Sequence, residues 1–141
     1  EAYQGSSFDI GVIDPSIPGM IKLAPKAINA TLFRPYLWES NNFAMLLSGI
    51  ENFILLMITI IMIIRLRVFY LFLLIFRHHV LFFSVFFSLF FAFSVGLSTS
   101  NFGSLVRYKI PAMPFFVASL LIIIKSYNDL RKERKEQSFI T

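Results

Sequence analysis

Three long apolar stretches, at residues 43–64, 80–97 and 110–124, constrain the fold of this chain more than any other feature. The first stretch holds 22 residues. As a helix that rises 1.5 Å per residue it measures about 33 Å, enough to cross the hydrocarbon layer of a membrane. The polar residues that remain in the 141-residue chain are too few to cover these stretches in water. The sequence therefore predicts an all-α integral membrane protein with three transmembrane helices.

Charged residues separate the first two stretches. The first stretch ends at two cations, Arg65 and Arg67. The apolar residues 68–76 then lead to one Arg and two His at 77–79. Residues 68–76 form either a short helix in the interface or the start of one long tilted helix that runs to 97. We favour the short helix, because the charged group at 77–79 would be costly inside hydrocarbon. Small residues that we expect to contact other helices follow in the second span: Ser84, Ser88 and Gly96.

The N-terminal part is more polar. Residues 1–19 are rich in Gly, Pro and Ser, which predicts a loop. Residues 21–39 carry apolar side chains at roughly helical spacing and predict one or two short amphipathic helices on the membrane surface. We expect Pro25 to open a helix and Pro35 to break one. The alternative is a helix packed on a soluble domain.

The distribution of cations predicts the orientation in the membrane. Eight of the 13 Lys and Arg residues lie in two regions, at 65–77 and 125–135, which three spans place on one side. Excess Lys and Arg mark the cytoplasmic side. The N-terminus and the 98–109 connection then share the opposite, outer face. This gives an outer-face region at 1–42, a membrane region at 43–124 and a cytoplasmic basic helical tail at 125–141.

Several kinds of chemistry find no support in the sequence. The chain has no Cys, and its two His are adjacent, so we expect no metal site. Neither a Gly-rich phosphate loop nor a nucleophilic serine motif occurs, and we expect no cofactor. The short basic tail is a poor match to a nucleic-acid-binding surface, so we expect no nucleic-acid partner.

A cluster of cations on the predicted outer face is the strongest candidate for a binding site. Arg107, Tyr108 and Lys109 stand directly before the third span, and Arg34 lies in the N-terminal segment. Cations are disfavoured on outer loops, so their presence suggests a local role. Arg and Lys suit the phosphate of a lipid headgroup. The alternative is that these side chains only reach toward ordinary phospholipids.

Glu51 is the acidic residue that falls within a predicted span, nine residues into the first. An ionisable group at that position is a functional-site hypothesis. Glu51 could act as a base toward a sugar hydroxyl. The alternative, which we favour, is that Glu51 pairs with Arg34 or Arg107 to stabilise the fold.

Three segments carry a resemblance to a known family: ATLFRPYLWE, LLSGIENFILL and NFGSLVRYKIPAMPFF. They resemble the C-terminal part of bacterial multi-spanning proteins of surface-polysaccharide biosynthesis. The RYKIPAMP element is similar to a late segment of polyprenyl-phosphate-dependent glycosyltransferases of the GT-C type. The resemblance covers residues 24–124 and is most specific at 33–35 and 101–114.

The resemblance implies a module of the bacterial inner membrane that binds a lipid-linked sugar phosphate at the outer face. The substrate-binding residues would be Arg34, Asn101, Arg107, Tyr108 and Lys109. Catalytic carboxylates of such enzymes lie in an N-terminal half that has no counterpart here, so whether the chain is itself an enzyme stays open. Because the sequence begins at Glu1 and not at Met, we expect a longer parent or partner chains. The alternative function is a non-catalytic membrane subunit that packs against a larger complex.

Overall fold

The computed structural model describes residues 16–40, 42–99 and 101–140, so residues 1–15 of the predicted 1–19 loop lie outside this part. The described residues are almost entirely helical. In chain order the helices are α1 (Ile17–Phe33), the 3₁₀ turn η1 (Leu37–Glu39), α2 (Phe43–Leu66), α3 (Val68–Arg77), α4 (His79–Ser98), α5 (Phe102–Tyr108) and α6 (Met113–Ile140). Three of them, α2, α4 and the part Met113–Glu133 of α6, are long and apolar enough to cross a membrane. The chain is therefore an all-α integral membrane protein, as predicted.

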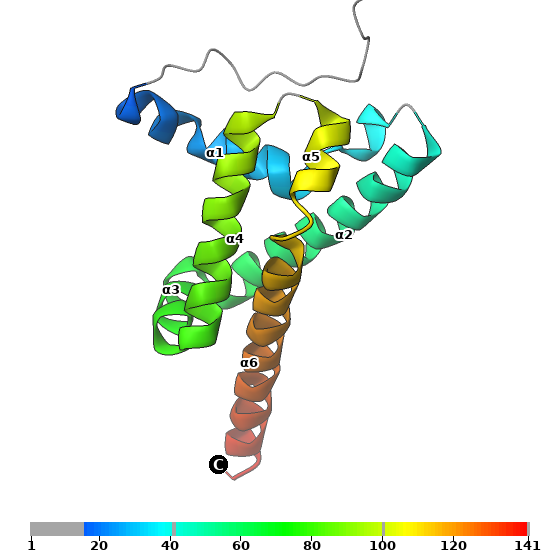
Figure 1. The fold of residues 1–141 in the computed structure, drawn as a ribbon. Helices are drawn as coiled ribbons and strands as arrows, with labels where there is room; N and C mark the ends of the chain where they lie inside the picture. Colours follow the sequence, from blue (N-terminus) through cyan, green and yellow to red (C-terminus); the bar gives the residue numbers. More distant parts are fainter. Residues whose placement is uncertain (1–15, 41, 100, 141) are drawn as a thin grey trace, which may run out of the picture.

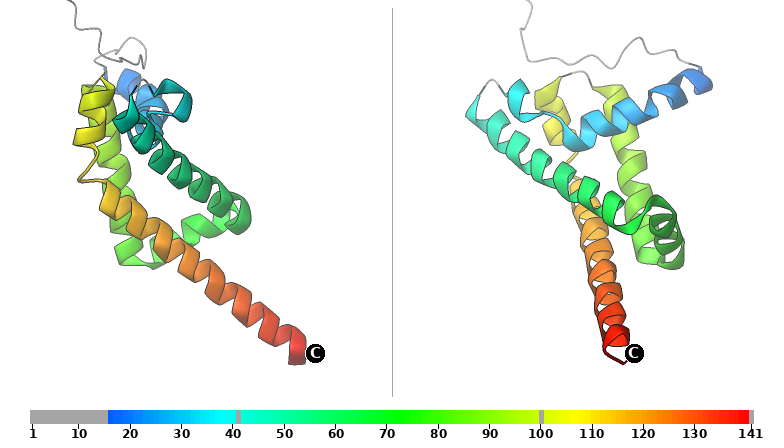
Figure 2. Two further views of the ribbon diagram at one scale, coloured as in Figure 1. Left: turned by 90° about the vertical axis from the view of Figure 1, so that its right-hand side faces the viewer. Right: turned by 180° about the vertical axis from the view of Figure 1, so that it is seen from behind.

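The helices divide between two ends of the molecule (Figures 1 and 2). Helix α2 runs obliquely away from η1, α4 returns, and α6 runs away again to the C-terminus. Helices α1 and α5 lie with η1 at one end, which we call the α1 end. Helix α3 lies at the other, the α3 end. The N-terminal helix and the connection before the third span therefore share one end, where α1 lies across α4.

Helix α1 begins earlier than the sequence suggested. The Ser16 hydroxyl accepts a hydrogen bond from the Gly19 N–H at 3.2 Å and caps the helix, so the loop predicted through residue 19 is wrong at its end. Pro18 occupies the first turn of α1. Backbone N–H groups in the first turn have no partner within the helix, so the N–H that proline lacks costs no hydrogen bond. Pro25 lies inside the helix and does not open it. The helix ends before Pro35, as predicted.

Small residues on α4 provide the packing surface for α1 and α6. Ser84, Ser88, Ala92 and Gly96 recur every four residues and are all buried. The Thr31 hydroxyl of α1 lies 2.8 Å from the Ala92 carbonyl oxygen. The Ser88 hydroxyl lies 3.4 Å from the carbonyl oxygen of Ala112, just before α6. Small side chains let helix backbones approach closely in lipid, so the predicted contact role of Ser84, Ser88 and Gly96 is confirmed.

Residues 68–77 form a separate short helix, as favoured from the sequence. Arg67 ends α2 and begins α3 with φ 57°. A positive φ costs a residue with a Cβ about 1–3 kcal/mol, and after this residue α3 runs in a different direction from α2 (Figure 1). A second break at His78 starts α4.

The third span and the tail are one helix, α6, rather than two elements. It begins at Met113, after a turn that follows α5, and it continues to Ile140. No Gly or Pro occurs after Pro114, so nothing in the sequence stops the helix where its composition changes from apolar to charged.

Many apolar side chains point away from the other helices. On α4, the rings of Phe82, Phe86 and Phe90 stack in a row, with centroids 6.1 and 6.2 Å apart, and all three are exposed. A helix surface of this kind is suited to contact with lipid tails.

Candidate functional site

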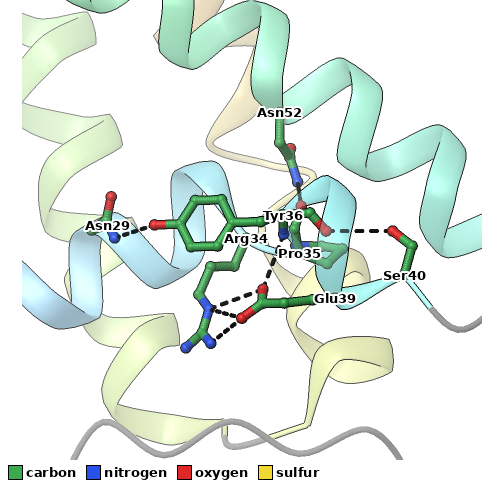
Figure 3. A network of polar contacts seen from close by, with 7 residues as sticks. All are labelled: Asn29, Arg34, Pro35, Tyr36, Glu39, Ser40 and Asn52. Carbon is green, nitrogen blue, oxygen red and sulfur yellow. Dashed lines mark hydrogen bonds and ion pairs between the residues drawn. The ribbon is translucent and has the colours of Figure 1, made fainter.

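Arg34 and Glu39 close the turn between α1 and α2 (Figure 3). The Arg34 Nε donates to both carboxylate oxygens of Glu39, at 3.1 and 3.2 Å, and Nη2 also donates to Oε1. The Tyr36 N–H donates to Oε2 at 3.0 Å. The guanidinium lies over the rings of Tyr36 and Phe102, at 5.7 and 5.3 Å. Arg34 therefore ties η1 to α5, and its ion pair is internal to the fold.

The environment of Glu39 shifts its acidity. Partial burial acts to raise the pKa of Glu39, but the hydrogen bonds from Arg34 and from the Tyr36 N–H outweigh it and hold the pKa below its usual 4.5. A carboxyl group with a lowered pKa stabilises the fold above its ordinary pKa, and that contribution is lost as the pH falls through the lowered value.

Acidification is therefore expected to loosen η1 before the rest of the protein. Trp38, the single Trp, stacks on Tyr36 with centroids 4.9 Å apart and reports on this turn. Trp38 fluorescence should change in a transition below pH 4.5, and Glu39→Gln should lack that transition. A titration that is the same in both proteins would contradict the role given to Glu39.

Lys109 lies inside the protein rather than on its surface. It is 4% exposed, and its Nζ donates to the Asn52 Oδ1 of α2 at 2.5 Å. The Asn52 Nδ2 in turn donates to the Pro35 carbonyl oxygen at 3.4 Å. Burial lowers the pKa of Lys109 to about 8, and the negative charge of Glu51 opposes that shift. Lys109 therefore links three segments at the α1 end.

Two grooves meet at Arg107. The first, which we call the polar groove, has a volume of about 530 Å³ and lies between the start of α2 and α5; its polar lining residues are Asn42, Ser48, Asn101, Ser104 and Arg107. The second, the apolar groove, has a volume of about 370 Å³; it is lined by Phe91, Ser94, Val95, Ser98, Arg107, Tyr108 and Pro111. Arg107 is exposed and lines both grooves.

The residues predicted to bind substrate are thus divided in space. Asn101, Arg107 and Tyr108 line the grooves, whereas Arg34 and Lys109 do not. Arg34 forms an ion pair with Glu39, and Lys109 is buried against Asn52. Asn101 also caps α5, because its Oδ1 accepts from the Gly103 N–H at 2.8 Å.

Glu51, the predicted catalytic candidate, is exposed on α2, and it acts electrostatically on Lys109. From the sequence, Glu39 was a weaker catalytic candidate than Glu51, and the structure places it in the ion pair with Arg34. Asn52 was noted only as the neighbour of Glu51, and its contact with Lys109 was not predicted. Two features of the sequence could have indicated these contacts. Glu39 follows Arg34 by five residues across a Pro turn, and Asn52 lies beside Glu51 in the first span. Within the described ranges, no group of three His, Asp or Glu is arranged to hold a metal ion.

Taken with its helices, this site defines the chain as an α-helical integral membrane protein with an amphiphilic pair of grooves at one end. Comparison with protein-family models, with curated proteins and with solved structures finds no match to it.

Proposed function

We propose that this chain binds a lipid-linked sugar phosphate at the α1 end. It would serve as the C-terminal membrane module of a polyprenyl-phosphate-dependent glycosyltransferase or polysaccharide assembly protein of the bacterial inner membrane. In this proposal the α1 end faces the periplasm and the C-terminus faces the cytoplasm. The sequence resemblance and the charge distribution both support that assignment.

The position of Arg107 between the two grooves is the observation that carries the proposal. A lipid-linked sugar has an apolar chain, a phosphate and a polar sugar, in that order. The apolar groove offers Phe91, Val95 and Pro111 to the chain. Arg107 offers its planar guanidinium to the phosphate. The polar groove offers amide and hydroxyl groups that can hydrogen-bond a sugar.

The chemical step is not assigned to these grooves. The described residues that line them include no carboxylate. Glu51 is the candidate for a base in this proposal, since it is exposed on α2 beside Asn52. The reaction would otherwise depend on carboxylates of a larger parent or of a partner chain.

Replacing Arg107 with Gln should weaken the binding of a polyprenyl phosphate by about 10- to 100-fold, the loss expected for one hydrogen-bonded charge. Helicity should not change, because Arg107 is exposed. Binding can be measured with the purified full chain in neutral detergent. Arg77→Gln, at the opposite end, is the control and should bind normally. Equal binding by wild type and Arg107→Gln would remove the phosphate role.

A non-catalytic subunit of a larger membrane complex is the second candidate. The exposure of Glu51 on a spanning helix favours it, because an ionised carboxylate facing lipid is costly and a partner chain can supply a cation. The two functions differ in what the isolated chain does. Headgroup binding by the purified chain supports the first, and binding that appears only in a complex with another chain supports the second.

A further inference from the structure

Three arginines line a further cavity, at the α3 end, which is separate from the two grooves and which the proposed function does not use. The cavity has a volume of about 570 Å³. Arg65 and Arg67 come from the junction of α2 and α3, Arg131 comes from α6, and Tyr70 and Tyr127 complete the polar lining. Leu66 and Leu130 supply its apolar part. The residues that form it lie up to 66 positions apart in the sequence.

The lining of this cavity is positively charged without compensation. Among the residues whose side chains the structure describes, its lining includes no carboxylate. Among the side chains that the structure describes, which exclude those of residues 134, 136 and 138–140, none of the three arginines forms an ion pair. The Arg65 Nη1 donates to the Tyr127 hydroxyl oxygen at 3.4 Å, which joins the end of α2 to α6. All three arginines are exposed, and three like charges that line one cavity attract an anion from the solvent.

The backbone of Arg67 gives a second, independent indication. Its φ of 57° is a conformation that glycine adopts without steric conflict and that a residue with a Cβ disfavours. The sequence nevertheless has arginine there, at the rim of the cavity. A strained, charged residue that lines a cavity points to a role for its side chain.

The neighbouring pocket has a different charge. Arg77, His78 and Lys125 lie there with Asp129 and Glu133, so cations and carboxylates are mixed. The uncompensated charge is therefore local to the three-arginine cavity and is not a general property of the α3 end.

We infer that the cavity formed by Arg65, Arg67 and Arg131 binds a phosphate group. Arginines bind phosphate oxygens in bidentate geometry, and two tyrosine hydroxyls can donate to the same oxygens. The phosphate would belong either to the headgroup of an anionic lipid, whose tails lie along α2 and α3, or to a free phosphorylated solute. The site is separate from the grooves at Arg107, and its failure would leave the proposed function untouched.

Native mass spectrometry of the full chain in neutral detergent tests the inference, with phosphatidic acid as the lipid probe and inorganic pyrophosphate as the soluble probe. All proteins carry Arg107→Gln, so that binding at the other end does not contribute. Arg67→Gly and Arg131→Gln should each weaken retention of a phosphate-bearing probe by about tenfold. Arg77→Gln is the matched control and should retain the probe. Arg67→Gly should keep its thermal stability or gain some, because glycine relieves the backbone at this position.

If the protein retains phosphatidic acid and pyrophosphate does not compete with it, the ligand is a lipid headgroup. If pyrophosphate does compete with the lipid, the phosphate group is itself sufficient for binding. Unchanged retention in Arg67→Gly and Arg131→Gln would overturn the inference. So would an equal loss in Arg77→Gln, which would mean that the whole surface attracts anions without a defined site.

Discussion

Replacing Gly96 with alanine is expected to separate α1 from α4 and to lower the stability of the protein by about 1–3 kcal/mol, the range typical of overpacking. A Cβ at this position would lie 2.4 Å from the Ala27 carbonyl oxygen and 2.8 Å from the Ala27 Cα. These are backbone atoms, so no side-chain rotation can make room. The α1 backbone would have to move, and the Thr31 contact with Ala92 would be lost with it.

Thermal unfolding in detergent measures this effect. Gly103→Ala is the matched control, since both changes put alanine for glycine in a helix and both raise helix propensity. Among the described residues, a Cβ at Gly103 would meet only the Asn101 Oδ1, at 3.3 Å, which is the end of a side chain and needs to shift by only a few tenths of an ångström. Gly103→Ala should therefore be close to neutral. If the two variants unfold at the same temperature, the close approach of α1 to α4 at Gly96 does not contribute to stability.

Replacing Asn52 with leucine should be the most damaging change at the α1 end, with a loss of about 3 kcal/mol. It would leave the buried Lys109 ammonium without the oxygen that accepts its hydrogen bond. Without its acceptor, the buried Lys109 of the variant should release its proton at a lower pH than the Lys109 of the unaltered protein, whose pKa is about 8. The difference in stability between the two proteins should therefore decrease as the pH rises toward 8. Above that pH, Lys109 is neutral in both proteins and the difference should stay constant.

The double variant Asn52→Leu/Lys109→Met separates this explanation from general disruption of packing. It replaces both partners with apolar side chains, so no buried polar group is left without a partner, and much of the stability should return. Thermal unfolding of the two single variants and the double variant provides the cycle. Strictly additive losses would show that Asn52 and Lys109 do not stabilise each other.

Much of the fold could be predicted from local sequence. The length and apolar composition of α2 and α4 identify them as spans, and the charged group at 77–79 correctly separates α3 from α4. Pro35 ends α1 because it has no N–H to continue the helical hydrogen bonds and because it favours an extended conformation for Arg34 before it. The continuity of α6 was missed, because a change from apolar to charged composition alters what a helix faces without breaking it.

The candidate site was less predictable, since it depends on which distant residues meet. A Lys near a membrane interface is normally expected to reach water. Lys109 does not, because Asn52, 57 residues earlier, provides an acceptor in the interior. Arg34 similarly became part of the scaffold once the Pro35 turn brought Glu39 back to it. Only Arg107 kept both the charge and the exposure that the hypothesis needed.

The uninterrupted course of α6 gives the molecule a mechanical property. Its 28 residues extend for about 42 Å from a turn beside the Arg107 grooves to the far end of the chain. A stiff rod of that length magnifies movement: tilting it by about 5° about its first turn would carry its last residues sideways by about 4 Å. A ligand that shifts the turn at residues 109–112 would thereby move the C-terminal residues of α6, on the other side of the bilayer.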